Sequence, residues 1–228
     1  MPISDRTLEF LMENRLRDSR PWFLEHKAEY QQYVIQPMRD LVEQLAPTML
    51  KIDPLLVVEP KVDKTISRIY RDIRFSKDKS LYRDVMWCVF LRDKKQYADM
   101  PAFVMEYSPN GFRYGCGYYQ APPKVMAAMR ELILANSKGF QKARKAYEGQ
   151  TLFQMEGETY KRSKYPAQPE AVQNWLNRRN IAFMHNSQDI ALLCSDGLAD
   201  VLAQGFQQLM PMYDFLCQAE QHARETAD

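Results

Sequence analysis

Apolar side chains recur at three- and four-residue steps through roughly the first 53 residues, which is the spacing of a buried helix face. The pattern predicts a helix over residues 4–14 and a second helix capped by Ser19. Pro37 is expected to interrupt or kink the second helix because its ring displaces the preceding turn, and Pro47 is a second candidate break. The helical part is expected to end at Asp53.

The pattern changes beyond Ser80, where aromatic and β-branched residues predict strands at 85–92, 102–107 and 111–119. The turn from Ser108 to Gly111 has Pro at its second position and Gly at its last, which favours a hairpin. The three strands are therefore expected to form an antiparallel meander. A short apolar run at 55–58 is a further candidate strand.

The second half of the chain predicts a mixture of helices and short strands. Helices are expected at 122–135, at 137–147, after Pro169 and over 195–223 with an interruption near Pro211, and short strands at 152–155 and 181–184. We expect a single α+β domain over residues 1–228, in which N-terminal and C-terminal helices flank a mainly antiparallel sheet with a central three-strand meander.

In the stretch from Thr65 to Arg83, the spacing of the apolar residues fits both a helix and a strand. Its isoleucines and Tyr70 fit one face of a short helix over 65–73, whereas a strand would place Ile69, Arg71, Ile73 and Phe75 on one side. We favour the helix. The stretch contains six Lys or Arg and two Asp, so its charge exceeds what its own carboxylates can neutralise.

The overall charge of +2 is too mild to identify a nucleic-acid-binding protein. Its distribution is informative, because residues 61–95 hold eleven Lys or Arg and five Asp, an excess of +6. The N-terminus lacks the apolar core of a signal peptide, and no run of about eighteen apolar residues could span a bilayer. We therefore expect a cytoplasmic protein with no membrane partner and with four reduced cysteines.

The candidate chemistry is the binding of an anion. Arginine forks match phosphate and carboxylate groups, lysines add charge, and hydroxyl groups add neutral donors. A Gly-x-Gly element before a helix start could let an anion approach the backbone, but the motif is weak, and a bulge or a tight strand crossing is the favoured explanation. The candidate ligand-binding residues are Arg68, Arg71, Asp72, Arg74, Ser76, Lys77, Lys79, Tyr82, Gly115 and Gly117.

Established catalytic and cofactor motifs are missing from the sequence. It contains no phosphate-loop, dinucleotide-binding, Ser-His-Asp or His-Glu-x-x-His pattern, and its three histidines are scattered. No metal site is predicted, and the sequence identifies neither a catalytic residue nor a cofactor.

Three separated motifs together resemble one protein family. They are Trp22-Phe23 after a turn at 14–20, the run Arg68-x-x-Arg71-Asp72-x-Arg74-Phe75-Ser76-Lys77-Asp78-Lys79-Ser80-x-Tyr82, and Gly115-x-Gly117 ahead of a helix with Met129-Arg130. The chain resembles the family called domain of unknown function 2461, and the similarity extends through residues 161–166 and the Pro169 helix. Leu81 departs from that family's pattern, which usually has Pro at this position.

The resemblance implies one α+β domain in a chiefly bacterial family and no particular reaction. Three functions stay open. The protein binds, or acts as an enzyme on, a small phosphorylated or carboxylated ligand; it binds nucleic acid through the basic stretch; or it is a non-catalytic interaction module in which the motif is a structural ion-pair clamp. Neither its status as an enzyme nor its oligomeric state follows from the sequence.

Overall fold

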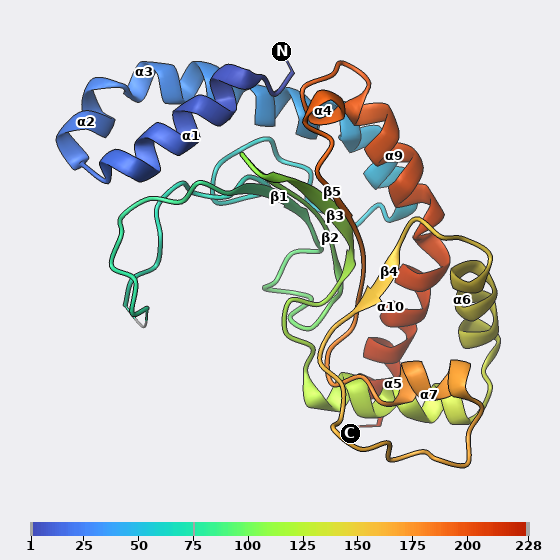
Figure 1. The fold of residues 1–228 in the computed structure, drawn as a ribbon. Helices are drawn as coiled ribbons and strands as arrows, with labels where there is room; N and C mark the ends of the chain where they lie inside the picture. The colour runs from blue at the N-terminus through green and yellow to red at the C-terminus, as the bar shows by residue number, and fades with distance from the viewer. Residues whose placement is uncertain (1, 75, 227–228) are drawn as a thin grey trace. The chain divides into compact units, whose positions relative to one another are not determined.

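The structure is a computed structural model that describes residues 2–74 and 76–226. Its N-terminal part is helical, as the spacing of its apolar residues predicts (Figure 1). The capping residues are confirmed, since Ser4 precedes the first helix in a capping box and Ser19 Oγ accepts the N–H of Trp22. The helices of this part are α1 (Asp5–Arg17), α2 (Arg20–Glu25), α3 (Lys27–Glu29), the π-helical segment η1 (Tyr30–Ile35) and α4 (Gln36–Ile52).

Pro37 does not interrupt the helix, because η1 runs directly into α4. Proline has no N–H with which to bond the carbonyl four residues earlier, which is that of Tyr33. The hydroxyl of the buried Thr7 on α1 donates to this carbonyl instead, at 2.6 Å. A side chain from another helix therefore bonds the carbonyl that an α-helical N–H at residue 37 would bond. Pro47 likewise lies inside α4.

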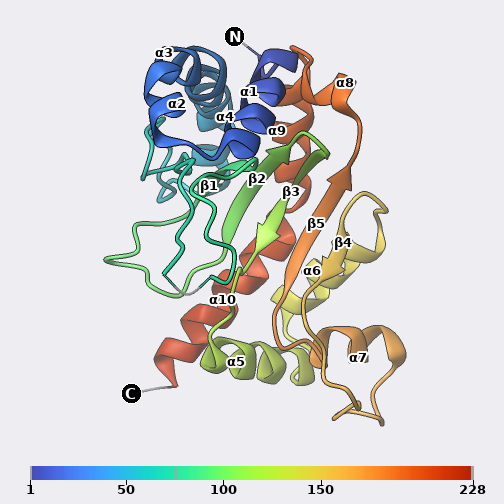
Figure 2. The ribbon, with the colours of Figure 1, turned by 60° about the vertical axis from the view of Figure 1, so that its left-hand side comes forward.

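The strands form one antiparallel sheet in the order β1-β2-β3-β5-β4 (Figure 2). The meander of the first three strands is confirmed, and β4 pairs with β5 in a register that joins Met155 to Phe183. Gly111 closes the predicted turn with a positive φ of 138°, which a residue with a side chain rarely adopts. The strands are β1 (Met86–Phe90), β2 (Ala102–Ser108), β3 (Gly111–Gly117), β4 (Gln154–Glu156) and β5 (Ala182–Ser187).

The later helices lie within a few residues of their predicted bounds, although the helix predicted from residue 195 begins at Leu198. Pro122 precedes the first of them, and Ser137 caps the second by accepting the N–H of Phe140. They are α5 (Pro123–Leu134), α6 (Lys138–Glu148), α7 (Glu170–Leu176), α8 (Ile190–Leu193), α9 (Leu198–Gln208) and α10 (Met210–Glu225). The α+β class with helices flanking the sheet is thus confirmed, while α8 has no counterpart in the sequence prediction.

The described chain divides into two compact units that alternate along the sequence. Unit 1 contains residues 1–90, 104–114 and 186–204, and unit 2 contains residues 91–103, 115–185 and 205–228. In unit 1, α4 packs on β1 and the rings of Phe10, Phe23 and Tyr30 lie against one another. In unit 2, α10 packs on α5 and α6, and the buried Trp175 contacts four other aromatic rings.

Two local predictions are wrong. Residues 65–73 form no helix, and residues 55–58 contribute only a single bridging residue, Leu56, rather than a strand. Phe75, which the strand alternative assigned to one face, lies outside the described residues. Among the described residues no helix is both long and apolar enough to cross a membrane.

The Thr7 hydroxyl yields a test of how Pro37 is accommodated. Thr7→Val keeps the shape of the side chain but leaves the carbonyl of Tyr33 unsatisfied, so we expect the free energy of unfolding to fall by about 1–3 kcal/mol. Thr7→Ser retains the hydroxyl and should lose clearly less. Urea denaturation of both variants measures the difference, and equal losses would show that the methyl group, rather than the hydrogen bond, stabilises this contact.

Candidate functional site

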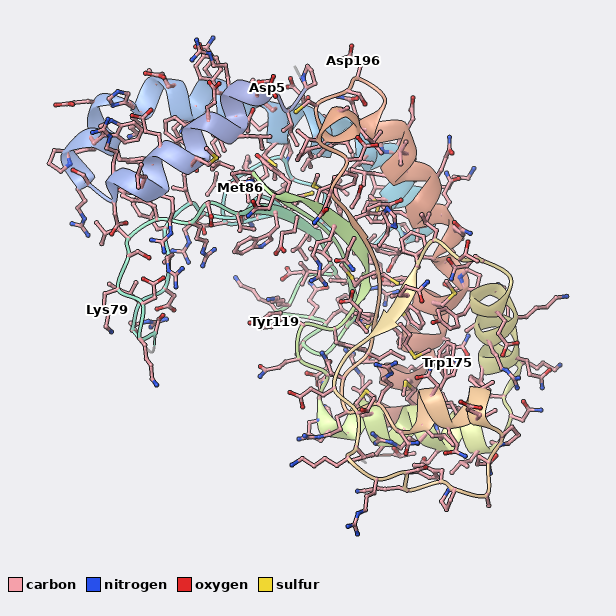
Figure 3. All side chains as sticks on the ribbon, viewed as in Figure 1. Asp5, Lys79, Met86, Tyr119, Trp175 and Asp196 are labelled. Carbon is pink, nitrogen blue, oxygen red and sulfur yellow. The ribbon has the colours of Figure 1, made fainter. Side chains whose placement is uncertain are left out.

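The charged stretch forms an extended arm, by which we mean residues 65–83. Its two sides pair with each other and continue the ladder of β1: the N–H of Ser67 donates to Trp87, that of Arg71 to Leu81, and that of Arg83 to Ile69. Figure 3 shows Lys79 toward the outer end of the arm and Met86 at its base. The paired backbone therefore presents the charged side chains on a two-stranded ribbon.

Aromatic rings fix one side of the arm. Tyr70 and Tyr82 oppose each other in the ribbon with ring centroids 5.3 Å apart, and Phe23 of α2 stacks on Tyr82 at 5.0 Å. Tyr82 is 1% exposed, and burial raises the pKa of its hydroxyl. Tyr82, one of the predicted ligand-binding residues, is thus placed in the core of unit 1.

Asp18 joins the arm to the end of α1. It adopts a left-handed conformation with φ 46°, which Asp tolerates better than most residues. Its Oδ1 accepts the backbone N–H groups of Leu81 at 2.7 Å and Tyr82 at 3.3 Å. Since the acceptor is a carboxylate, these hydrogen bonds are stronger than neutral ones.

A second carboxylate, Asp78, lies between two guanidinium groups. Arg15 of α1 binds it at 3.0 Å and Arg71 of the arm at 3.2 Å. The hydrogen bond from the backbone N–H of Ser80, followed by the charges of Arg71 and Arg15, holds the pKa of Asp78 below its usual value. The two arginine side chains are 31% and 28% exposed, so this ion-pair group is the most sheltered in the arm.

The remaining predicted residues on the arm are exposed, except Ser76, which is half-buried. Arg68 pairs with Asp63 and Arg74 with Asp72, all of them exposed, and the hydrogen bonds and charge of Arg74 lower the pKa of Asp72 to about 2. Lys79 donates to the carbonyl of Ile73. Ser76 and Lys77 make no hydrogen bond or ion pair with any residue that the structure describes.

Arg83 is absent from the predicted set and has the most distinctive surroundings. Its guanidinium lies 4.5 Å from the ring centroid of Trp87 and donates to the carbonyl of Arg68 at 3.4 Å. No carboxylate of the described chain lies within ion-pairing distance of it. Burial, and then the charges of Arg71 and Arg68, lower its pKa. The sequence signal was an arginine four residues before a tryptophan.

Two polar side chains of α1 and the arm are buried without partners. Both amide atoms of Asn14, which is 0% exposed, and the hydroxyl of Ser80 find no hydrogen-bonding partner in the described structure. Asn14 lies one helical turn before Asp18, on the face that meets the arm. An unsatisfied buried polar group costs about 1–3 kcal/mol, so this contact is weaker than its carboxylate anchor suggests.

Gly115 and Gly117 belong to unit 2, whereas the arm belongs to unit 1. A Cβ atom at Gly115 would overlap the Phe183 carbonyl, and one at Gly117 would overlap the Cα of Ala182, so β5 occupies the space that a side chain would need. Gly117 also has a φ of 147°. The close strand pairing therefore accounts for both glycines.

Two cavities lie in the described part of the chain, and neither has a predicted ligand-binding residue in its wall. One, of about 610 Å³, lies beside α7 in unit 2, and the other, of about 400 Å³, lies in unit 1 at the end of the β2–β3 hairpin. Among the described residues, no group of three or more His, Cys, Asp or Glu side chains is arranged to hold a metal ion. The arm is thus a charged surface, with one sheltered ion-pair group and several accessible cations.

Residues 6–215 match the family model described as "Conserved hypothetical protein (DUF2461)", which covers α1, the arm and the sheet. No curated protein matches the chain.

Removing the Asp18 carboxylate tests the attachment of the arm. In Asp18→Ala the N–H groups of Leu81 and Tyr82 lose their acceptor, and we expect the free energy of unfolding to fall by about 2 kcal/mol. Asp18→Asn keeps an oxygen acceptor and tolerates the left-handed backbone, so its loss should be below about 1 kcal/mol. Chemical denaturation measures both, and a harmless Asp18→Ala would contradict the anchoring role.

The ion pairs of Asp78 predict an acid-sensitive contribution to stability. The pKa of Asp78 is lower in the folded chain than in the unfolded chain, where it is about 3.9. The ion pairs therefore contribute fully to stability above that unfolded pKa, and the contribution is lost as the pH falls through the folded pKa. Wild type should therefore exceed Asp78→Asn in stability at pH 7, and the gap should narrow as the pH falls below about 4. Urea titrations at several pH values measure this gap, and a gap independent of pH would rule out the ion pairs as its source.

Proposed function

This chain belongs to the DUF2461 family of conserved hypothetical proteins, and we propose that it binds a ligand carrying a phosphate or carboxylate group, with Arg83 as the principal contact. The supporting observation is that the Arg83 guanidinium is held on the Trp87 ring and has no carboxylate partner in the described chain. A guanidinium fixed in this way can offer two parallel N–H donors to an oxyanion at little entropic cost.

Neighbouring arginines support the proposal. Arg68 and Arg71 lie close enough for their charges to act on Arg83. Arg68 is paired with an exposed carboxylate, and such surface pairs are worth only about 0–1 kcal/mol, so an incoming anion can replace Asp63 at little cost. The site therefore differs from the set proposed from sequence, since it is centred on Arg83 at the base of the arm rather than on Arg74, Lys77 and Lys79.

Arg71 serves a second purpose in this proposal. It shares Asp78 with Arg15, so it supports the position of the arm while its charge contributes to the anion site. In this proposal the ion pairs of Asp78 hold the arm in place, whereas Arg83 and Arg68 of the same motif bind the ligand. We also propose that the protein is cytoplasmic and that its family is chiefly bacterial. The proposal assigns no reaction and no cofactor.

Nucleic acid is the second candidate ligand. The outer part of the arm carries Arg74, Lys77 and Lys79 in exposed positions, and neither described cavity encloses them. An open row of cations suits the repeated phosphates of a polymer, whose binding weakens steeply with salt. In this case the outer cations would carry more of the affinity than Arg83.

Binding of inorganic phosphate, measured by calorimetry and by the shift in melting temperature, tests the proposal. Phosphate should stabilise wild type, and Arg83→Ala should weaken binding by about tenfold or more, as expected for a charge-assisted hydrogen bond of about 1.5–3 kcal/mol. Arg74→Ala is the matched control, because it removes the same charge from the arm at a residue paired with Asp72. It should change affinity by less than about threefold.

Other results would point elsewhere. Equal weakening by Arg83→Ala and Arg74→Ala would indicate nonspecific attraction to the charged arm rather than a site. If a single-stranded oligonucleotide binds with strong salt dependence while phosphate does not bind, nucleic acid is the better assignment. If neither binds at low salt, the motif serves as a structural clamp in an interaction module.

A further inference from the structure

Arg71 and Arg83 lie on the same face of the two-stranded ribbon that forms the arm. The N–H of Arg71 donates to the carbonyl of Leu81, which lies opposite it and two residues before Arg83 on the same strand. Opposed residues share a face of a ribbon, and so do residues two apart on one strand. The two arginines are therefore diagonal neighbours, with Cα atoms about 7–8 Å apart. Tyr70 and Tyr82, which oppose each other, belong to the other face.

Both guanidinium groups keep most of their hydrogen-bond donors, since each arginine side chain has several N–H groups arranged as a fork. Arg83 donates once, to the carbonyl of Arg68 at 3.4 Å. Arg71 forms an ion pair with Asp78 at 3.2 Å, but its guanidinium makes no hydrogen bond with any residue that the structure describes. Two neighbouring forks therefore remain available to acceptors on a ligand.

The positive charge at this face exceeds the negative charge beside it. Arg71 and Arg15 share the single carboxylate of Asp78, and Arg83 makes no ion pair with a carboxylate of the described chain. Three guanidinium groups and one carboxylate leave a net charge of +2. One anionic group on Arg83 would leave the donors of Arg71 unused. Since the Arg71 side chain is only 28% exposed, water weakens its attraction for a second anionic group less than at a fully exposed residue.

Arg68 does not offer a second position of this kind. It can assist the anionic group on Arg83, but its place next to Ile69 directs its side chain to the face opposite Arg71. Its Nε is already 2.8 Å from a carboxylate oxygen of Asp63, and its side chain is 66% exposed. The donors, the charge and the shared face that two anionic groups require therefore come from Arg83 and Arg71.

We infer that the ligand is a small molecule with two anionic groups, one bound by Arg83 and the other by Arg71, joined by a short carbon or phosphoanhydride skeleton. The inference rests on the proposed anion-binding function and extends it from one charged group to a class of molecule. The hydrogen bond from Arg15 to Asp78, at 3.0 Å, stays intact in the complex. The arm therefore keeps its attachment to α1 while Arg71 receives the ligand.

Calorimetry on the full chain with two matched pairs of ligands tests the inference. Pyrophosphate is compared with inorganic phosphate, and 3-phosphoglycerate with glycerol 3-phosphate, which has a hydroxymethyl group in place of the carboxylate. At least one ligand with two anionic groups should bind about tenfold or more tightly than its counterpart, as expected for an added charge-assisted hydrogen bond.

Two variants locate the second anionic group. Arg71→Gln should reduce the advantage to less than about threefold, while inorganic phosphate, bound by Arg83, should stay within about threefold of its wild-type affinity. Arg74→Ala removes the same charge from the arm at a residue paired with Asp72, and it should retain the advantage. If Arg71→Gln does not fold, Arg71→Lys decides, since it keeps the charge without the fork and should still lose most of the advantage.

The possible failures are distinguishable. If inorganic phosphate binds through Arg83 but neither ligand with two anionic groups binds more tightly than its counterpart, the inference is wrong and the proposed function stands. The inference is also wrong if the variants of Arg71 and Arg74 reduce the advantage equally, because net charge alone then explains it. If no phosphate compound binds, both fail. A single-stranded oligonucleotide that binds more tightly than both small ligands would assign the two arginines to nucleic acid instead.

Discussion

The position of the charged arm depends on one carboxylate, that of Asp18, which accepts two consecutive backbone N–H groups of the arm. This contact is available only because α1 ends at Arg17 and the next residue turns into a left-handed conformation that directs its side chain across the helix end. The helix terminus and the arm are about 60 residues apart in sequence, yet they form one structural element. The packing of Tyr82 on Phe23 and the pairing of Asp78 with Arg15 both follow from this arrangement.

Once the arm is held in this way, its charges separate into two groups by their exposure to water. Arg71, Asp78 and Arg15 are partly sheltered, so their attraction contributes to holding the arm. Arg68 and Arg74 have carboxylate partners in solvent, where water and ions compete with the pair. A motif with six cations is thus not one site. Arg83 differs from both groups, since its guanidinium lies on an aromatic ring and makes no ion pair with a carboxylate of the described chain.

Sequence patterns predicted the elements whose determinants are local. Ser4 and Ser19 precede the first two helices as predicted, and the turn at Pro109-Asn110 joins β2 to β3. The arm was wrongly assigned as a helix because its isoleucines fit both periods, and the choice depends on pairing between residues about 10–20 apart in the chain. The surroundings of Arg83 could not be predicted either, because the contact of its guanidinium with the Trp87 ring is a property of the folded chain.

The anchor uses the backbone of Leu81 and Tyr82 rather than their side chains, and this has an evolutionary consequence. The family resemblance leads us to expect proline in place of Leu81 in relatives, and proline has no N–H to donate. The 2.7 Å hydrogen bond from residue 81 to Asp18 therefore cannot form in such a relative, whose arm would be attached through the N–H of residue 82 alone. Divergence at this single position can adjust how firmly the arm is held while every charged residue of the motif stays the same.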